Sequence, residues 1–131
     1  MAKALRLAYQ NIDEDIKNVK KLNNQIVDEL QKYEDVYINS TKNSIPHILN
    51  ISVLGVKPET MLHALEEDEI YISTQSACST GETSKAVMAI TNSIEKASSS
   101  IRVSISRKTT EKEIKTFVKS FDKCYTKLKL K

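Results

Sequence analysis

The side chain whose type and surroundings most suggest chemistry is the thiol of Cys78. It lies in the block Ser76 to Gly81, where small polar residues leave little bulk to shield the sulfur from an electrophile. The thiolate is the nucleophilic form of cysteine, and helix N-terminal amides or nearby cations lower a thiol pKa from its usual value of about 8.5. A helix is predicted a few residues further on. Although most intracellular cysteines pack in the interior, this polar setting predicts a nucleophile.

Cys124, the second of the two cysteines, is predicted to pack instead. It follows Phe117 by seven residues and Phe121 by three, beside the apolar stripe of the predicted last helix. In a reducing compartment both cysteines are expected to stay thiols. His47 and His63 lie far from either cysteine in the sequence, so we predict no metal site.

Arg102 is the second residue whose type and place suggest chemistry. It lies in a segment whose strict alternation turns Ile101, Val103 and Ile105 toward the core and Arg102 and Ser104 toward the opposite face. The planar guanidinium matches a carboxylate. A solvated arginine on an exposed sheet face is about as consistent with the residues alone.

The elements that must position these residues form the order αββαβαβα. Residues 1–33 show a 3.6-residue apolar period and predict one long helix. This helix begins almost at residue 1 without a convincing cap, which suggests that the chain was cut from something longer. Strands are predicted at 36–38, 47–53, 70–73 and 101–105. Further helices are predicted to begin at residue 58, to span about 84–92 with Val87 and Ile90 buried, and to follow a capping box formed by Thr110 and Glu113. This order predicts an α+β fold with a small, largely antiparallel sheet covered by helices.

Length and charge narrow the function classes. We expect residues 1–131 to form one domain. A net charge of +3 does not demand a nucleic-acid partner. The start of the chain has neither a signal peptide nor a spanning helix, so we expect a cytoplasmic protein.

A lysine repeats every fourth residue from Lys115 to Lys131, and we call this row the lysine stripe. Such a row is most typical of a solvated helix face, although it could also meet an acidic acceptor protein.

Three ordered blocks together resemble the C-terminal third of NifS/IscS-like cysteine desulfurases. They are Ser76-Ala77-Cys78-Ser79, Ser100-Ile101-Arg102-Val103-Ser104 and Thr109-Thr110-Glu111-Lys112-Glu113-Ile114, and the segments 47–52 and 61–66 fit as well. The resemblance runs from about Ala4 to about Tyr125. It implies the small domain of a fold-type I enzyme that uses pyridoxal phosphate, with the helix of residues 1–33 linking to the large domain.

The resemblance also implies roles for the two residues. Cys78 matches the nucleophile that takes sulfur from L-cysteine, leaving L-alanine and a persulfide, and Arg102 matches the arginine that binds the substrate carboxylate. The cofactor-binding lysine and histidine of the family belong to the large domain and match no residue here, so the chain alone is expected to be inactive. The parent enzyme is expected to be a homodimer that passes sulfur to a scaffold for iron–sulfur clusters or to a tRNA- or cofactor-thiolation enzyme.

Two other classes of function remain open on the residues. One is a stand-alone persulfide carrier, in which Cys78 receives sulfur from another protein without a cofactor. The other is a small protein- or RNA-interaction module that uses the lysine stripe, although seven aromatic residues offer no evident stacking platform.

Overall fold

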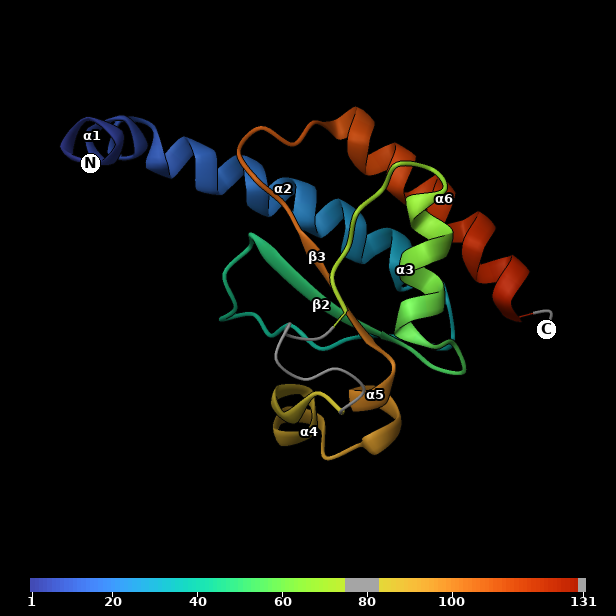
Figure 1. The fold of residues 1–131 in the computed structure, drawn as a ribbon. Helices are drawn as coiled ribbons and strands as arrows, with labels where there is room; N and C mark the ends of the chain where they lie inside the picture. The colour runs from blue at the N-terminus through green and yellow to red at the C-terminus, as the bar shows by residue number, and fades with distance from the viewer. Residues whose placement is uncertain (75–82, 130–131) are drawn as a thin grey trace.

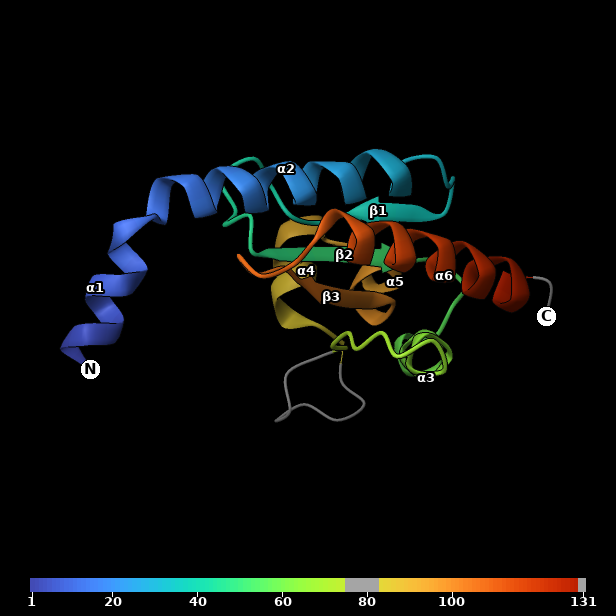
Figure 2. The same cartoon turned by 90° about the horizontal axis from the view of Figure 1, so that it is seen from above.

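The computed structural model describes residues 1–74 and 83–129, and these residues form helices on both faces of one antiparallel sheet. Helices α2 (Ile12–Leu30), α3 (Pro58–Glu66) and α6 (Glu111–Lys129) lie on one side of the sheet, and the short helices α4 (Lys85–Thr91) and α5 (Ile94–Ser98) lie on the other (Figure 1). Figure 2 shows α1 extending away from the rest of the described residues. The predicted α+β fold with a small antiparallel sheet is confirmed.

The N-terminal 33 residues do not form one continuous helix, so this part of the prediction is wrong. They form α1 (Ala2–Gln10) and α2 (Ile12–Leu30), and the chain breaks at Asn11, which has φ −130° and ψ 21°. Asp13, Glu14 and Asp15 occupy the first turn of α2, where carboxylates favour the positive end of a helix dipole. The apolar period continues across the break and therefore concealed it.

The sheet contains β1 (Val36–Ile38), β2 (Ile48–Val53) and β3 (Ser100–Ser104) in the order β1-β2-β3, with both pairs antiparallel. The predicted alternation is confirmed for β3, because Ile101, Val103 and Ile105 are buried and Arg102 is exposed. The predicted strand at residues 70–73 is reduced to a single antiparallel bridge between Ser73 and Arg102.

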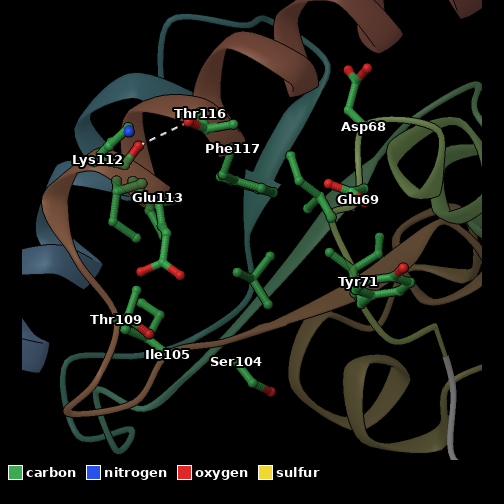
Figure 3. Close-up of a pocket in the computed structure, with 15 residues that line it drawn as sticks. Asp68, Glu69, Tyr71, Ser104, Ile105, Thr109, Lys112, Glu113, Thr116 and Phe117 are labelled. Atoms are coloured by element: carbon green, nitrogen blue, oxygen red, sulfur yellow. Dashed lines mark hydrogen bonds between the residues drawn. The ribbon is translucent and has the colours of Figure 1, made fainter.

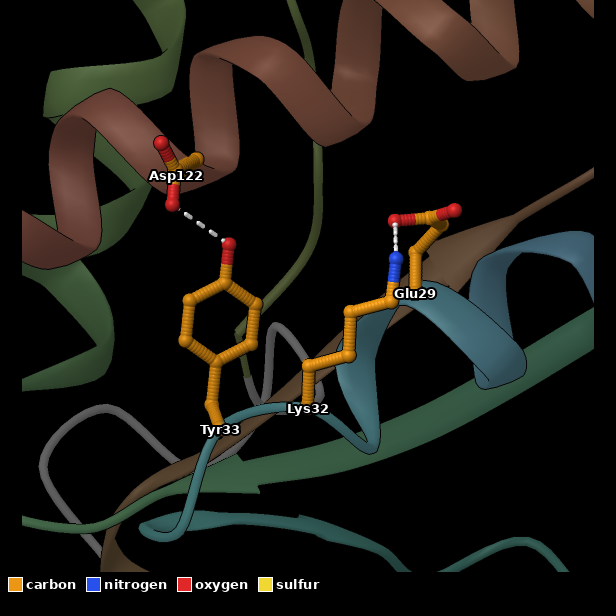
Figure 4. Close-up of polar contacts among 4 residues, drawn as sticks. All are labelled: Glu29, Lys32, Tyr33 and Asp122. Carbon is orange, nitrogen blue, oxygen red and sulfur yellow. Dashed lines mark hydrogen bonds and ion pairs between the residues drawn. The ribbon is translucent and has the colours of Figure 1, made fainter.

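The core lies between this sheet and three helices, α2, α3 (Pro58–Glu66) and α6 (Glu111–Lys129). The predicted capping box begins α6, since the Thr110 backbone N–H donates to Glu113 Oε2 at 2.7 Å and the Glu113 N–H donates to Thr110 Oγ1 at 3.3 Å. Figure 4 shows Tyr33, just after α2, donating from its hydroxyl to Asp122 Oδ1 of α6 at 2.7 Å. Burial, together with this contact to a carboxylate, raises the pKa of the Tyr33 hydroxyl.

The second face of the sheet is partly covered by α4 (Lys85–Thr91) and α5 (Ile94–Ser98). The predicted helix near 84–92 is confirmed as α4 and buries Val87, but Ile90 is 63% exposed, contrary to expectation. Helix α5 was not predicted. It contacts β2, where the Ser52 hydroxyl donates to the Lys96 carbonyl at 2.7 Å.

Candidate active site

Four polar residues lie side by side across the second face of the sheet, one from each neighbouring segment. Asn39, directly after β1, donates from its backbone N–H to the Asn50 carbonyl of β2 at 2.9 Å. Asn50 is in turn the register partner of Arg102 on β3, and Arg102 forms an antiparallel bridge with Ser73. We call Asn39, Asn50, Arg102 and Ser73 the polar row. It lies next to the row of Tyr37, Ser52 and Ser100, which α5 partly covers.

Arg102 has the position that its strand pattern predicts. Its neighbours Ile101 and Val103 point into the core, so the guanidinium projects from the opposite face and is exposed. Among the residues that the structure describes, the guanidinium has no hydrogen-bond or ion-pair partner. A cation held on a rigid strand and open to solvent can bind an anion without first breaking an internal ion pair.

The backbone of Arg102 also fixes the start of the segment that carries the thiol. The Arg102 N–H donates to the Ser73 carbonyl at 2.7 Å, and the Ser73 N–H donates to the Arg102 carbonyl at 3.0 Å. Cys78 is five residues further along the chain, and it lies outside the described residues, as does the rest of its block.

The chain returns to the same side of the sheet at Ser84. The Ser84 N–H donates to the Ala97 carbonyl of α5 at 3.1 Å, and the Ser84 hydroxyl accepts the N–H of Val87 at 3.4 Å and so caps α4. The described residues on the two sides of the cysteine-bearing segment are therefore attached to β3, which carries Arg102, and to α5, which lies on the Arg102 face of the sheet.

Cys124 has the packing role that the sequence predicts. It is 3% exposed within the core cluster, and burial raises the pKa of its thiol, which disfavours the nucleophilic thiolate.

A groove of about 480 Å³ opens between β3, the start of α6 and residues 68–72, and it does not include Arg102. Figure 3 shows Asp68, Glu69 and Tyr71 on one side of it and Thr109, Lys112 and Glu113 on the other. Two of its carboxylates are already engaged, Glu113 in the capping box and Asp68 with Lys123 at 3.0 Å. Its walls are mainly aliphatic and aromatic side chains, so we assign it no chemistry.

The described residues give no structural support for a metal site, a membrane-spanning helix or a binding role of the lysine stripe. No three His, Cys, Asp or Glu side chains converge there as metal ligands would, and no helix there is long and apolar enough to span a membrane. In the lysine stripe, Lys123 pairs with Asp68, which is consistent with an ordinary solvated helix face.

Sequence reasoning missed Asn39 and Asn50. Neither residue is distinguished by its local sequence, because Asn39 only follows the strand predicted at 36–38 and Asn50 lies at an outward position of the strand predicted at 47–53. A signal for Asn50 was present, because it alternates with Leu49 and Ile51 and must share a face with other outward residues. The register that places it opposite Arg102 is not contained in that alternation.

The model of the aminotransferase class-V family matches residues 1–117, and the chain belongs to this family. Within it, the chain is similar to cysteine desulfurases. It is 36% identical over 132 residues to cysteine desulfurase IscS of Buchnera aphidicola subsp. Schizaphis graminum, which covers 98% of this chain and 32% of the relative. A second cysteine desulfurase IscS, from Methylobacillus flagellatus, is 37% identical over 117 residues, 87% of this chain and 28% of the relative.

The solved structures agree with these relatives. A NifS-like protein from Rickettsia africae superposes with a TM-score of 0.77 at 27% identity, covering 92% of this chain and 31% of the other. The chain therefore spans about a third of the length of the relatives that it matches. Family membership implies pyridoxal phosphate as the cofactor of the full-length enzymes.

Proposed function

We propose that this chain is the C-terminal small domain of a cysteine desulfurase, an enzyme that converts L-cysteine to L-alanine and leaves a persulfide on Cys78. Residues 1–131 form one domain in this proposal, and α1 and α2 link it to the large domain. The similarity to cysteine desulfurases over nearly the whole chain supports the proposal.

The structural observation that best supports this function is that Arg102 and Ser73 exchange two backbone hydrogen bonds. This bridge attaches the only exposed cation among the described β3 residues to the segment that leads to Cys78. A carboxylate-binding group and a sulfur-accepting group can then act on one small amino acid, because proximity on one scaffold replaces a separate encounter.

The role proposed for Cys78 is nucleophilic. Its thiolate attacks the sulfur of the bound L-cysteine, a sulfur–sulfur bond forms, and the carbon–sulfur bond breaks with its electron pair passing to the carbon. Protonation of that carbon gives L-alanine, and Cys78 keeps the transferred sulfur as a persulfide. The role proposed for Arg102 is to hold the substrate carboxylate in a fixed place through paired N–H donors.

The described residues do not fit pyridoxal phosphate by themselves. A Schiff base needs a lysine amine directed at the site, and Lys96 of α5, which borders this face, instead has its amine 4.1 Å from the centroid of the Tyr37 ring. The proposed enzyme therefore takes its cofactor-binding groups from the large domain.

The further assignments rest on the same proposal. The whole enzyme would be a cytoplasmic homodimer. It would pass the persulfide sulfur to an acceptor protein, either a scaffold for iron–sulfur clusters or a tRNA- or cofactor-thiolation enzyme.

The experiment that tests the function is a reconstitution. The chain is mixed with the large domain of an IscS relative, pyridoxal phosphate and sulfur-labelled L-cysteine, and peptides are read by mass spectrometry. We expect L-alanine to be released and one sulfur atom to be added to the peptide that contains Cys78. Release of alanine by the chain alone would show that the lysine that forms the Schiff base with the cofactor is not confined to the large domain. Labelling from a persulfide donor protein, without cofactor or alanine, would favour a carrier.

Arg102→Lys is expected to raise the KM for L-cysteine by about tenfold in the reconstituted enzyme. The lysine keeps the charge, but its ammonium cannot make two parallel hydrogen bonds to one carboxylate. Steady-state alanine release measures the change. Arg107→Lys is the matched control, because Arg107 lies beyond β3 and pairs with Asp15 at 3.7 Å. An unchanged KM and kcat in Arg102→Lys would remove Arg102 from the site.

A further inference from the structure

The amide of Asn50 is an uncharged hydrogen-bonding group beside Arg102 in the polar row. The two residues are register partners on β2 and β3. The backbone of Asn50 bonds toward Asn39 and Ser40, and the backbone of Arg102 bonds toward Ser73. They therefore form a non-hydrogen-bonded antiparallel pair, in which Cα atoms approach to about 4.5 Å and side chains are closest.

The direction of the Asn50 amide follows from a chain of hydrogen bonds that begins at a main-chain carbonyl. The Lys96 carbonyl can only accept, so the Ser52 hydroxyl donates its proton there, at 2.7 Å. The Ser52 oxygen is then an acceptor for Asn39, whose Nδ2 lies 2.7 Å away. The second proton of that Nδ2 goes to Asn50 Oδ1, at 2.8 Å.

The opposite orientation of Asn39 would turn its oxygen toward the Ser52 oxygen, whose proton is already used. It would lose the hydrogen bond from Nδ2 to Ser52 and would leave the Nδ2 group buried without that partner, whereas the present orientation leaves only an acceptor, Asn39 Oδ1, buried without a partner among the described residues. Asn39 is 6% exposed, so its amide is held in a packed position. The oxygen of Asn50 is thereby committed to Asn39.

The consequence is that Asn50 has its Nδ2 protons left to donate, on a half-buried side chain next to an exposed guanidinium. Among the described residues Asn50 Nδ2 has no acceptor. Two neighbouring donor groups, one charged and one neutral, suit a ligand that only accepts, which is the property of a carboxylate.

We infer that Asn50 is a second carboxylate-binding residue, donating from Nδ2 to the same carboxylate that Arg102 holds, with Asn39 as the positioning residue that fixes the Asn50 amide. The inference rests on the proposed role of Arg102 in binding an amino-acid carboxylate. It assigns the binding of that group to two strands of the sheet instead of one.

The test is an NMR titration of the isotope-labelled 131-residue chain with L-alanine, with L-alaninamide as the probe that lacks a carboxylate. We expect L-alanine to shift the side-chain N–H signals of both Arg102 and Asn50 with one common dissociation constant, and L-alaninamide to shift neither. Asn50→Asp keeps the oxygen that accepts from Asn39 and replaces only the donor. It is expected to weaken L-alanine binding by about tenfold or more, because the new carboxylate repels the ligand and pairs with Arg102.

Asn24→Asp is the matched control, because Asn24 is exposed on α2, on the opposite side of the sheet, and the substitution adds the same charge. Its dissociation constant should stay within about twofold of the original. If L-alanine shifts Arg102 while Asn50 stays unmoved and Asn50→Asp binds equally well, the inference about Asn50 is overturned and the proposed function stands. If neither side chain responds up to the solubility limit of L-alanine, the carboxylate-binding roles of both residues are overturned together.

Discussion

Exchange of Cys78 for serine is expected to abolish persulfide formation in the reconstituted enzyme, a loss of at least about a thousandfold in labelled sulfur per chain. The substitution replaces one atom, so little change in size or polarity accompanies it. A serine hydroxyl is almost wholly protonated near neutral pH, whereas a few per cent of an unperturbed cysteine is thiolate. Binding of L-cysteine should persist, because the proposed carboxylate contacts are on β2 and β3 and not on residue 78.

Cys124→Ala is the matched control for this result. Cys124 is buried in the core cluster and its thiol pKa is raised, so its removal should leave sulfur transfer within about twofold of the original. Mass spectrometry of the two variants separates the thiols directly. Labelled sulfur on Cys124 in the Cys78→Ser variant would contradict the assignment of the nucleophile.

The parts of the fold that could be predicted are those set by local periodicity. The alternation through Ile101, Val103 and Ile105 placed Arg102 on the outer face, and the spacing of Thr110 and Glu113 placed the start of α6. Each of these patterns depends on residues within a few positions of one another. The resemblance to the NifS/IscS-like family added the order of the blocks, and the family match agrees with it.

The parts that could not be predicted are a break between two helices, the exposure of one residue in a short helix and the register of two strands. The first helix ends before Asn11 although the apolar period continues, and a new helix begins at Ile12 with three carboxylates in its first turn. Ile90 is exposed since α4 is only seven residues long and packs through Val87. Asn50 faces Arg102 only because β2 and β3 pair in one particular register, which no short-range pattern specifies.

Phe121→Ala is expected to lower the free energy of unfolding of the chain by about 3–5 kcal/mol. Phe121 is 0% exposed, and its ring centroid lies 5.7 Å from that of Tyr33, 5.9 Å from that of Phe117 and 6.2 Å from that of Tyr125. Truncation removes buried apolar surface and leaves a cavity among aromatic rings that cannot all move inward. The expected loss is a large share of the 5–15 kcal/mol by which domains are usually stable.

Urea unfolding followed by circular dichroism measures this loss as a lower midpoint at an unchanged slope. Tyr71→Ala is the matched control, because Tyr71 is also aromatic but 78% exposed, and its removal should change the unfolding free energy by less than about 0.5 kcal/mol. The core that Phe121 fills also supports the buried face of β3, so the same variant should weaken carboxylate binding at Arg102 only in proportion to the unfolded fraction. A loss below about 1 kcal/mol would mean that α6 does not pack on the core of this domain as described, and the rigid strand on which Arg102 depends would then lack its support.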